Sequence, residues 1–139
     1  GKEELEQVVQ LARLLWPEHG PESLAREFGP LLASLEAVVY LANDRGEWAG
    51  FAQCQLRHDY VEGTCSSPVG YLEGVYVAEA YRRKGVARAL LTQCQQWAKE
   101  QGCREFASDC EIGNVNSLRF HLSTGFAEAN RIICFTKKL

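Results

Sequence analysis

Apolar residues recur every three or four positions in the middle of the chain, which is the period of a helix with one buried face. The stripe comprises Val86, Leu90, Leu91, Cys94, Trp97 and Ala98. Gly102 follows it and is the residue type that commonly ends a helix. We therefore predict a helix from Val86 to Gly102.

The same period appears in two earlier segments, 2–16 and 23–34. Pro17 is expected to end the first helix, because the residue before a proline is pushed out of the helical region. Ser23 is a candidate N-cap of the second helix, and Gly29-Pro30 is expected to break or kink it. A further short helix is predicted over residues 114–123.

Segments rich in β-branched and aromatic residues without a helical period predict strands. They cover residues 36–42, 47–57, 71–77, 104–109 and 131–137. The sequence Asn43-Asp44-Arg45-Gly46 has the composition of a hairpin turn, and the polar segment 58–69 is predicted to be a loop. A chain of 139 residues with this mixture of elements is expected to form one α/β domain over residues 1–139.

The segment between strand 71–77 and the helix from Val86 has the features of an anion-binding turn. It reads Arg82-Arg83-Lys84-Gly85-Val86-Ala87. A helix start leaves backbone N–H groups unpaired and carries partial positive charge, and the small residues Gly85 and Ala87 let a phosphate come close. We expect the turn to bind a diphosphate, although an ordinary strand-to-helix turn with a basic rim would have the same composition.

Two motifs at a fixed separation resemble one enzyme superfamily. Arg82-x-x-Gly85-x-Ala87 resembles the Arg/Gln-x-x-Gly-x-Gly/Ala signature of the GNAT superfamily of N-acetyltransferases. Asn114-x-x-Ser117-x-x-Phe120-His121-x-x-x-Gly125-Phe126 is similar to its Asn-x-x-Ala-x-x-Leu-Tyr-x-x-x-Gly-Phe segment. A closer likeness, to the aminoglycoside 6'-N-acetyltransferases, rests on Leu15-Trp16-Pro17, Arg57-His58-Asp59-Tyr60-Val61, Ser66-Ser67-Pro68, Leu72-Glu73-Gly74, and Gly102-Cys103-Arg104-Glu105 running into Ala107-Ser108-Asp109.

The resemblance implies a GNAT fold: a mixed, mostly antiparallel sheet that is splayed at its centre and has helices on both faces. It implies acetyl-CoA as cosubstrate and direct transfer of the acetyl group, within a ternary complex, to the 6'-amine of an aminoglycoside antibiotic, which would give resistance. A covalent acetyl-cysteine route is disfavoured. Two alternatives stay open: acetylation of another polyamine, amino sugar or peptide amine, and a sensor domain that binds coenzyme A without transferring anything.

The resemblance also assigns the acid–base chemistry. An alkyl amine has a pKa of roughly 10.4, so the site needs an acceptor for its proton and a donor for the departing thiolate. Glu73 and Asp109, on neighbouring strands, are the carboxylates expected to bind the amino sugar and to act as base. His121 stands where the family usually has the tyrosine that protonates the thiolate. The structural alternatives are a solvated Glu73, a capping Asp109 and a histidine packed between helix and strand.

The remaining site residues follow from the same resemblance. The expected cofactor contacts are Val75, Tyr76 and Val77 through their main chain, Arg83, Lys84, Gly85, Val86, Ala87 and Arg88 around the diphosphate, and Asn114 on the pantetheine arm. Trp16 and Tyr60 match aromatic positions that line the sugar pocket, or else they are core residues. Asn130 departs from the acidic residue that related enzymes often carry nearby, which removes one ammonium contact.

Charge and composition narrow the partners. A formal net charge of -3 argues against nucleic acid and fits a cationic substrate better. No apolar run is long enough to cross a bilayer, and no leader precedes Glu3, so a cytoplasmic protein that does not use a membrane is expected. Six cysteines without a Cys-x-x-Cys pair predict buried reduced thiols rather than disulfides or a metal site.

Two further expectations come from the family. Its members usually begin with a strand before the first helix, whereas this sequence enters the helix almost at once and contains no methionine. This suggests that an N-terminal edge strand is missing from the sequence. Dimers are frequent in the family, so a homodimer is expected by analogy.

Overall fold

The structure is a computed structural model that describes residues 5–6, 9–10, 13 and 20–139. Its elements follow the order α2 (Pro21–Ala33), β1 (Ala37–Asp44), β2 (Glu47–Arg57), β3 (Val69–Val77), the 3-10 turn η1 (Glu79–Tyr81), α3 (Val86–Glu100), β4 (Phe106–Ser108) and α4 (Val115–Ser123). Residues 5–6, 9–10 and 13 of the predicted N-terminal helix are helical. The predicted pocket residue Trp16 lies outside the described residues.

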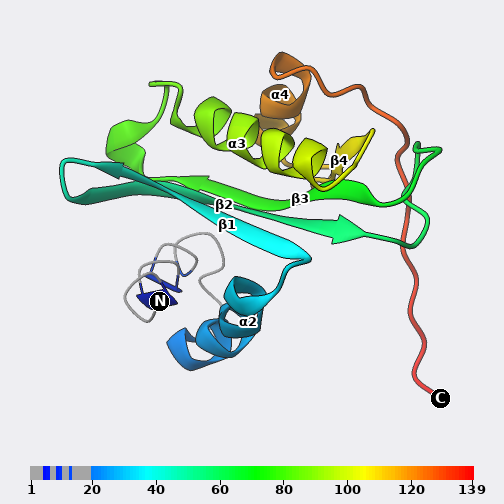
Figure 1. Cartoon of the computed structure of the whole chain (residues 1–139). Coiled ribbons are helices and arrows are strands. Elements are labelled where there is room, and N and C mark those ends of the chain that lie inside the picture. The colour runs from blue at the N-terminus through cyan, green and yellow to red at the C-terminus, as the bar shows by residue number, and fades with distance from the viewer. Residues whose placement is uncertain (1–4, 7–8, 11–12, 14–19) are drawn as a thin grey trace.

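The four strands form one sheet in the order β1-β2-β3-β4. Neighbours are antiparallel except for β3 and β4, which are parallel. Helices α3 and α4 lie on one side of the sheet and α2 lies on the other (Figure 1). β4 pairs with β3 only from Gly70–Phe106 to Leu72–Ser108, so the two strands part after that point. The predicted mixed, mostly antiparallel sheet with helices on both faces is therefore confirmed, and the separation predicted at its centre lies between β3 and the edge strand β4 of the described sheet.

The apolar stripe of α3 packs on the sheet as the sequence predicts. Leu90, Leu91 and Cys94 are almost fully buried and contact Cys54 of β2 and Leu72 of β3. On the opposite face, Leu24 of α2 packs against Phe51 of β2. Full burial of one such side chain stabilises a fold by roughly 1.5–3 kcal/mol. The central strands β2 and β3, which carry the residues of interest below, are thus held from both sides.

Helix α2 begins earlier than predicted and is not ended by its proline. The N–H of Leu24 donates to the carbonyl of Gly20 (3.0 Å), so the helix starts at Pro21 and Ser23 is not its N-cap. A proline fits the first helical position because its missing N–H would be unpaired there anyway. The helix continues through Pro30 to Ala33, where less than one turn remains and few hydrogen bonds are lost.

The predicted hairpin turn is confirmed but shorter than expected. β1 and β2 extend to Asp44 and Glu47, which leaves only Arg45 and Gly46 in the turn. Both have positive φ angles (54° and 91°), as a two-residue turn between twisted antiparallel strands requires. The side-chain oxygen of Asn43 accepts the N–H of Gly46 at 2.9 Å and closes the turn.

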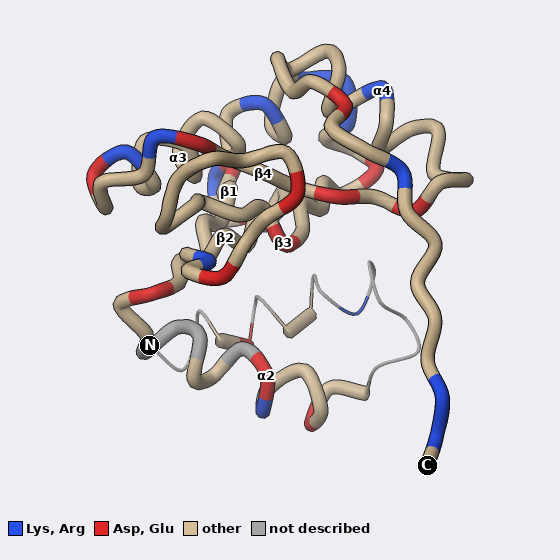
Figure 2. The backbone as a smooth tube through the Cα atoms, turned by 90° about the vertical axis from the view of Figure 1, so that its right-hand side faces the viewer, with Lys and Arg blue, Asp and Glu red and all other residues tan. Residues whose placement is uncertain are grey.

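The predicted final strand, 131–137, is wrong. Residues 126–139, here called the C-terminal segment, have no regular secondary structure. Ile133 and Phe135 are 81% and 89% exposed, and toward its end the segment runs away from the rest of the chain (Figures 1 and 2). Alternating apolar residues form a strand only where a neighbouring strand supplies hydrogen-bond partners, and the C-terminal segment is not part of the described sheet.

The cysteines are free, but only some are buried. Cys54 and Cys94 are buried as predicted, whereas Cys65, Cys110 and Cys134 are exposed. Cys134 was predicted in a strand and instead lies in the C-terminal segment, where nothing covers it. In the described part of the chain, no three His, Cys, Asp or Glu side chains come together as a metal site would need. None of the described helices is both long and apolar enough to span a membrane.

Candidate active site

A β-bulge interrupts β3 where it parts from β4. Gln53 and Cys54 are adjacent in β2, yet they pair with Gly74 and Leu72, which leaves Glu73 as an extra residue. Bulges bend a strand and redirect side chains, and they are frequent beside active sites. The bulge therefore marks the point at which the sheet opens.

Beyond the bulge, main-chain groups of β3 point into the opening between β3 and β4. The N–H of Ala78 donates to the carbonyl of Ala49 in β2 (2.7 Å). Because N–H directions alternate along a strand, those of Val77 and Val75 point away from β2. The carbonyl of Val77, on the same side as its N–H, accepts the Nε–H of Arg82 (3.0 Å). These amides are available to a ligand entering the opening.

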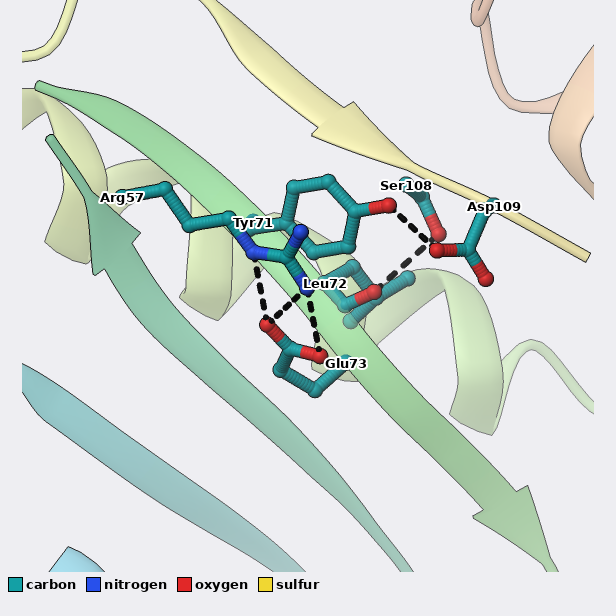
Figure 3. Close-up of polar contacts among 6 residues, drawn as sticks. All are labelled: Arg57, Tyr71, Leu72, Glu73, Ser108 and Asp109. Carbon is teal, nitrogen blue, oxygen red and sulfur yellow. Dashed lines mark hydrogen bonds and ion pairs between the residues drawn. The ribbon is translucent and has the colours of Figure 1, made fainter. Parts of the chain in front are cut away.

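Four side chains form a polar network on β2, β3 and the end of β4 (Figure 3). The guanidinium of Arg57 donates to both carboxylate oxygens of Glu73, at 2.8 and 3.1 Å from its Nη2 and 3.1 Å from its Nε. Its central carbon lies 3.4 Å from the ring centroid of Tyr71. The Tyr71 hydroxyl donates to Asp109. Burial, and then this hydrogen bond, raise the pKa of the Tyr71 hydroxyl well above its ordinary value.

The two carboxylates predicted from sequence are thus parts of one network. Glu73 and Asp109 are linked through Arg57 and Tyr71, whose involvement the sequence did not reveal. Arg57 and Glu73 are 16 residues apart, and only the register of β2 on β3 brings them together. The Oδ1 atom of Asp109 accepts no hydrogen bond from the described residues, whereas both oxygens of Glu73 are engaged.

A cavity of about 490 Å³ lies between the turn that precedes α3 and helix α4. Of the predicted cofactor residues, it is lined by Val77, Arg83, Gly85, Val86, Ala87 and Arg88. Gly85 is the N-cap of α3 with φ of 81°, and no atom lies within 4 Å of where a Cβ would stand. The N–H groups of residues 86–88 begin the helix, and such groups bind anions.

The cavity also has a wall from α4, with Arg119, that the sequence reasoning missed. Tyr81 and Arg82 before α3, and Asn116, Arg119, Phe120, Ser123 and Thr124 of α4 and its C-cap, complete its lining. Among the described residues, none of its arginines is in an ion pair, and no carboxylate lines it. The spacing of three to four residues in the predicted helix 114–123 would have identified this face. The cavity therefore suits a ligand with several negative charges.

Four predicted cofactor residues do not line this cavity. Asn114 caps α4, because its side-chain oxygen accepts the N–H of Ser117 at 3.0 Å. The ammonium of Lys84 instead lies 5.7 Å from the ring centroid of Tyr81. Val75 and Tyr76 stand further along β3, at the opening described above, and Tyr76 also packs beside the core of Phe51.

His121 is fixed between α4 and the end of β4. Its Nδ1 lies 2.7 Å from the carbonyl oxygen of Ser117, and its Nε2 lies 2.8 Å from the hydroxyl of Ser108. The ring meets those of Phe120 and Phe126 edge-on at centroid distances of 5.7 and 5.0 Å. The predicted general acid therefore has both ring nitrogens engaged in the described structure, one of them with Ser108 at the end of β4.

The predicted sugar-pocket residue Tyr60 lies on the loop after β2 and is 76% exposed. This loop is attached to the start of β4 by Glu105, which accepts the Cys65 N–H (2.8 Å) and the Ser66 hydroxyl. The hydrogen bond from Ser66, and to a smaller extent the one from Cys65, lower the pKa of the Glu105 carboxyl. Asn130 of the C-terminal segment donates to Glu62 of the same loop at 3.1 Å. Asn130 thus contacts the loop that carries Tyr60.

Comparison with known proteins gives a consistent result. The acetyltransferase (GNAT) family profile matches residues 5–126. An aminoglycoside N(6')-acetyltransferase type 1 of Serratia marcescens is 45% identical over 94% of this chain and 90% of its own length. The structure of AAC(6')-Iy with the bisubstrate analogue CoA-S-monomethyl-acetylneamine superimposes with a TM-score of 0.95 at 37% identity, covering 99% of this chain and 94% of that one. A CoA complex of AAC(6')-Iy gives a TM-score of 0.96 at 37% identity, covering 100% and 91%.

Proposed function

This chain belongs to the acetyltransferase (GNAT) family, and we propose that it transfers the acetyl group of acetyl-CoA to the 6'-amine of aminoglycosides. The observation that carries this proposal is the cavity lined by arginines and by the first residues of α3, which includes Val77 at the end of β3, the strand that also carries the carboxylate Glu73. Solved relatives with the same fold contain CoA or a CoA–aminoglycoside conjugate. Such an enzyme would protect the cell that makes it from the antibiotic.

Groups in this chain can be matched to the diphosphate, the arm and the thioester carbonyl of the coenzyme. We assign its diphosphate to the N–H groups at the start of α3 and to the arginines around them, because both favour negative charge. The arm then follows β3 into the opening, where the N–H groups of Val77 and Val75 face it. A main-chain N–H at this position can polarise the thioester carbonyl and stabilise the oxyanion that forms on attack.

Two carboxylates can act on the amine that accepts the acetyl group, each in a different role. Glu73 is held in one orientation by Arg57, so we assign it to binding the substrate ammonium. Asp109 keeps one oxygen free and is assigned to accepting the proton that the amine must lose before it attacks. The free amine then attacks the thioester carbon directly, and the amide forms as the thiolate leaves. We assign the sugar rings to the loop that carries Tyr60, and Trp16 to the same pocket.

The experiment compares initial rates of the purified protein on a kanamycin-like sugar with rates on spermidine and on a lysine peptide, and identifies the acetylated nitrogen by NMR. We expect acetylation of the sugar at the 6'-amine. Glu73→Gln should raise the KM for the sugar, and Asp109→Asn should lower kcat, each by a factor of ten or more, while CoA binding is unchanged. Glu27→Gln, a matched change on the exposed side of α2, should have no effect. Activity restricted to spermidine or the peptide would refute the aminoglycoside proposal.

We also propose that the protein is a homodimer. The C-terminal segment exposes Ile132, Ile133 and Phe135 side by side in the sequence, at 69%, 81% and 89%. Contiguous exposed apolar residues commonly mark contacts between proteins. Sedimentation of the purified chain should give twice the mass of one chain, and Ile133→Asp with Phe135→Asp should shift it to the monomer. A monomeric wild type would contradict this assignment.

The cytoplasm is the compartment that we propose for this enzyme. All six cysteines are free, which suits a reducing environment, and acetyl-CoA is made there. Fractionation of expressing cells, with the enzyme detected by its acetyltransferase activity, tests the assignment.

A further inference from the structure

Ser108 stands where β3 and β4 separate and has two partners for one hydroxyl group. It is the last residue of β4 and pairs with Leu72 of β3. Its Oγ lies 3.1 Å from the carbonyl oxygen of Leu72 (Figure 3) and 2.8 Å from Nε2 of His121. The other ring nitrogen of His121, Nδ1, lies 2.7 Å from the carbonyl oxygen of Ser117. The chain of contacts therefore ends at a carbonyl on each side.

The number of hydrogens on Ser108 and His121 decides which group donates in each of these contacts. Carbonyl oxygens only accept, so Nδ1 of His121 must carry a hydrogen for Ser117. The Ser117 hydroxyl is at 3.4 Å and competes poorly. In the imidazolium form, Nε2–H donates to Ser108, whose hydroxyl donates to Leu72, and every contact is a hydrogen bond. In the neutral form, Nε2 accepts from Ser108, and Leu72 loses its donor. Protonation of His121 thus switches the Ser108 hydroxyl from donating to His121 to donating to the carbonyl of Leu72.

The position of Ser108 matches the position of the leaving group, if the proposed acetyltransferase function holds. The coenzyme cavity includes Val77 at the far end of β3 and Phe120, the neighbour of His121. From Val77, β3 runs five residues back to Leu72, about 16 Å at roughly 3.3 Å per residue, and there the pair Leu72–Ser108 closes the opening between β3 and β4. If the thioester carbonyl lies near the carboxylates Glu73 and Asp109, its sulfur must lie near the pair Leu72–Ser108.

We propose that Ser108 is a catalytic residue that passes a proton from His121 to the departing thiolate. The C–S bond of the tetrahedral intermediate breaks, and its electron pair stays on sulfur. Sulfur takes the hydrogen of the Ser108 hydroxyl as that oxygen takes the hydrogen from Nε2 of His121. His121 is left neutral, with Nδ1–H on Ser117 and Nε2 accepting from Ser108, which is the second arrangement above. The amine proton leaves separately through Asp109, and solvent reprotonates His121 before the next turnover.

The direct test is the variant Ser108→Ala, measured with the amine that the wild type acetylates best. Loss of a positioned acid typically costs a factor of about 10² to 10⁴. We expect kcat to fall by at least a hundredfold, with both KM values and the calorimetric Kd for CoA within a factor of about three. Ser108→Thr, which keeps the hydroxyl, should restore most of kcat. Thr92→Ala removes a hydroxyl bonded to a main-chain carbonyl on α3 (2.9 Å) and should change nothing.

A second donor separates proton delivery from a structural role. The oxygen ester analogue of acetyl-CoA has an alkoxide leaving group, which needs a proton more than a thiolate does. Ser108→Ala should therefore lower the rate with the ester by a larger factor than the rate with acetyl-CoA. Equal factors for the two donors, or a folded Ser108→Ala variant with a near-normal kcat, would overturn the proposal.

The outcome is also separable from that of the proposed function. If the wild type acetylates only spermidine or a peptide, the aminoglycoside assignment fails while the relay is still measured on that amine. If it acetylates no amine at all, both fail. Should Ser108→Ala not fold, as judged by near-UV circular dichroism, His121→Asn must show the same loss and the same difference between donors; a near-normal kcat there would overturn the relay.

Discussion

The pair formed by Arg57 and Glu73 is expected to stabilise the fold as well as to orient the carboxylate. The guanidinium makes three hydrogen-bond contacts with Glu73 and stacks on Tyr71. The exposed fractions of the two side chains are 38% and 21%, so the pair lies between an open surface bridge and a buried one. Exposed pairs contribute about 0–1 kcal/mol, whereas removing one partner of a buried pair costs about 3–5 kcal/mol.

We therefore expect Arg57→Met to lower the free energy of unfolding by about 2 kcal/mol, because methionine keeps part of the contact with Tyr71 but leaves Glu73 without its counter-charge. For a chain of 139 residues this lowers Tm by roughly 7 °C. Removing the carboxylate as well should recover part of the loss: the double variant Arg57→Met with Glu73→Gln should be more stable than the sum of the single effects predicts, by about 1–2 kcal/mol.

Chemical denaturation monitored by circular dichroism gives the four free energies of this cycle. The slope of the transition must stay constant among the variants for the comparison to be valid. Arg45→Met, in the exposed hairpin turn, is the matched control for loss of an arginine. Strict additivity of the two substitutions, or a stability of Arg57→Met equal to that of the wild type, would refute the idea that the pair holds Glu73 in place.

Three other substitutions have defined outcomes. Gly50→Ala should destabilise the fold by more than 2 kcal/mol in thermal melts, because the new Cβ would stand 2.3 Å from the carbonyl oxygen of Tyr76, whereas Gly113→Ala, with open space, should not. Gly85→Ala should cost about 1 kcal/mol from its positive φ and weaken CoA binding severalfold in calorimetry. The pKa of Glu105 is lowered in the fold, so its carboxylate stabilises the loop fully above the ordinary pKa of a glutamate, and this contribution is lost as the pH falls through the folded-state pKa. Amide protection factors in residues 58–68, which correct for the intrinsic pH dependence of exchange, should fall as the pH is lowered through that range, and Glu105→Gln should abolish this dependence.

The sequence predicted well those features that depend on residues close together in the chain. Helix α3 and the turn before it follow from a local period and from the residue types at Gly85 and Ala87. The final strand failed for the converse reason, because a strand needs a partner that local alternation does not reveal. Ile133 and Phe135 alternate like strand residues and yet are exposed.

The site was predicted as a set of residues but not as a network. Glu73, Asp109 and His121 were identified through a resemblance, whereas Arg57 and Ser108, which contact them, were not. Both contacts cross between elements distant in sequence, and they depend on strand register and on how α4 docks. Nothing in a single sequence fixes those two quantities.

The bulge at Glu73 connects the two halves of the proposed chemistry. The N–H of Gly70 points toward β4, where it donates to a main-chain carbonyl at 3.2 Å, while the N–H of Ala78 points toward β2. In a regular strand, residues an even number apart point their N–H groups the same way, so the observed directions require one extra residue between them. The register places that residue at Glu73. If the same residues formed a regular strand without the bulge, the N–H of Val75 would be five positions from that of Gly70 and would point into the ladder with β2. The bulge therefore places a carboxylate for the amine at its extra residue and lets the N–H of Val75 face the carbonyl that the amine attacks.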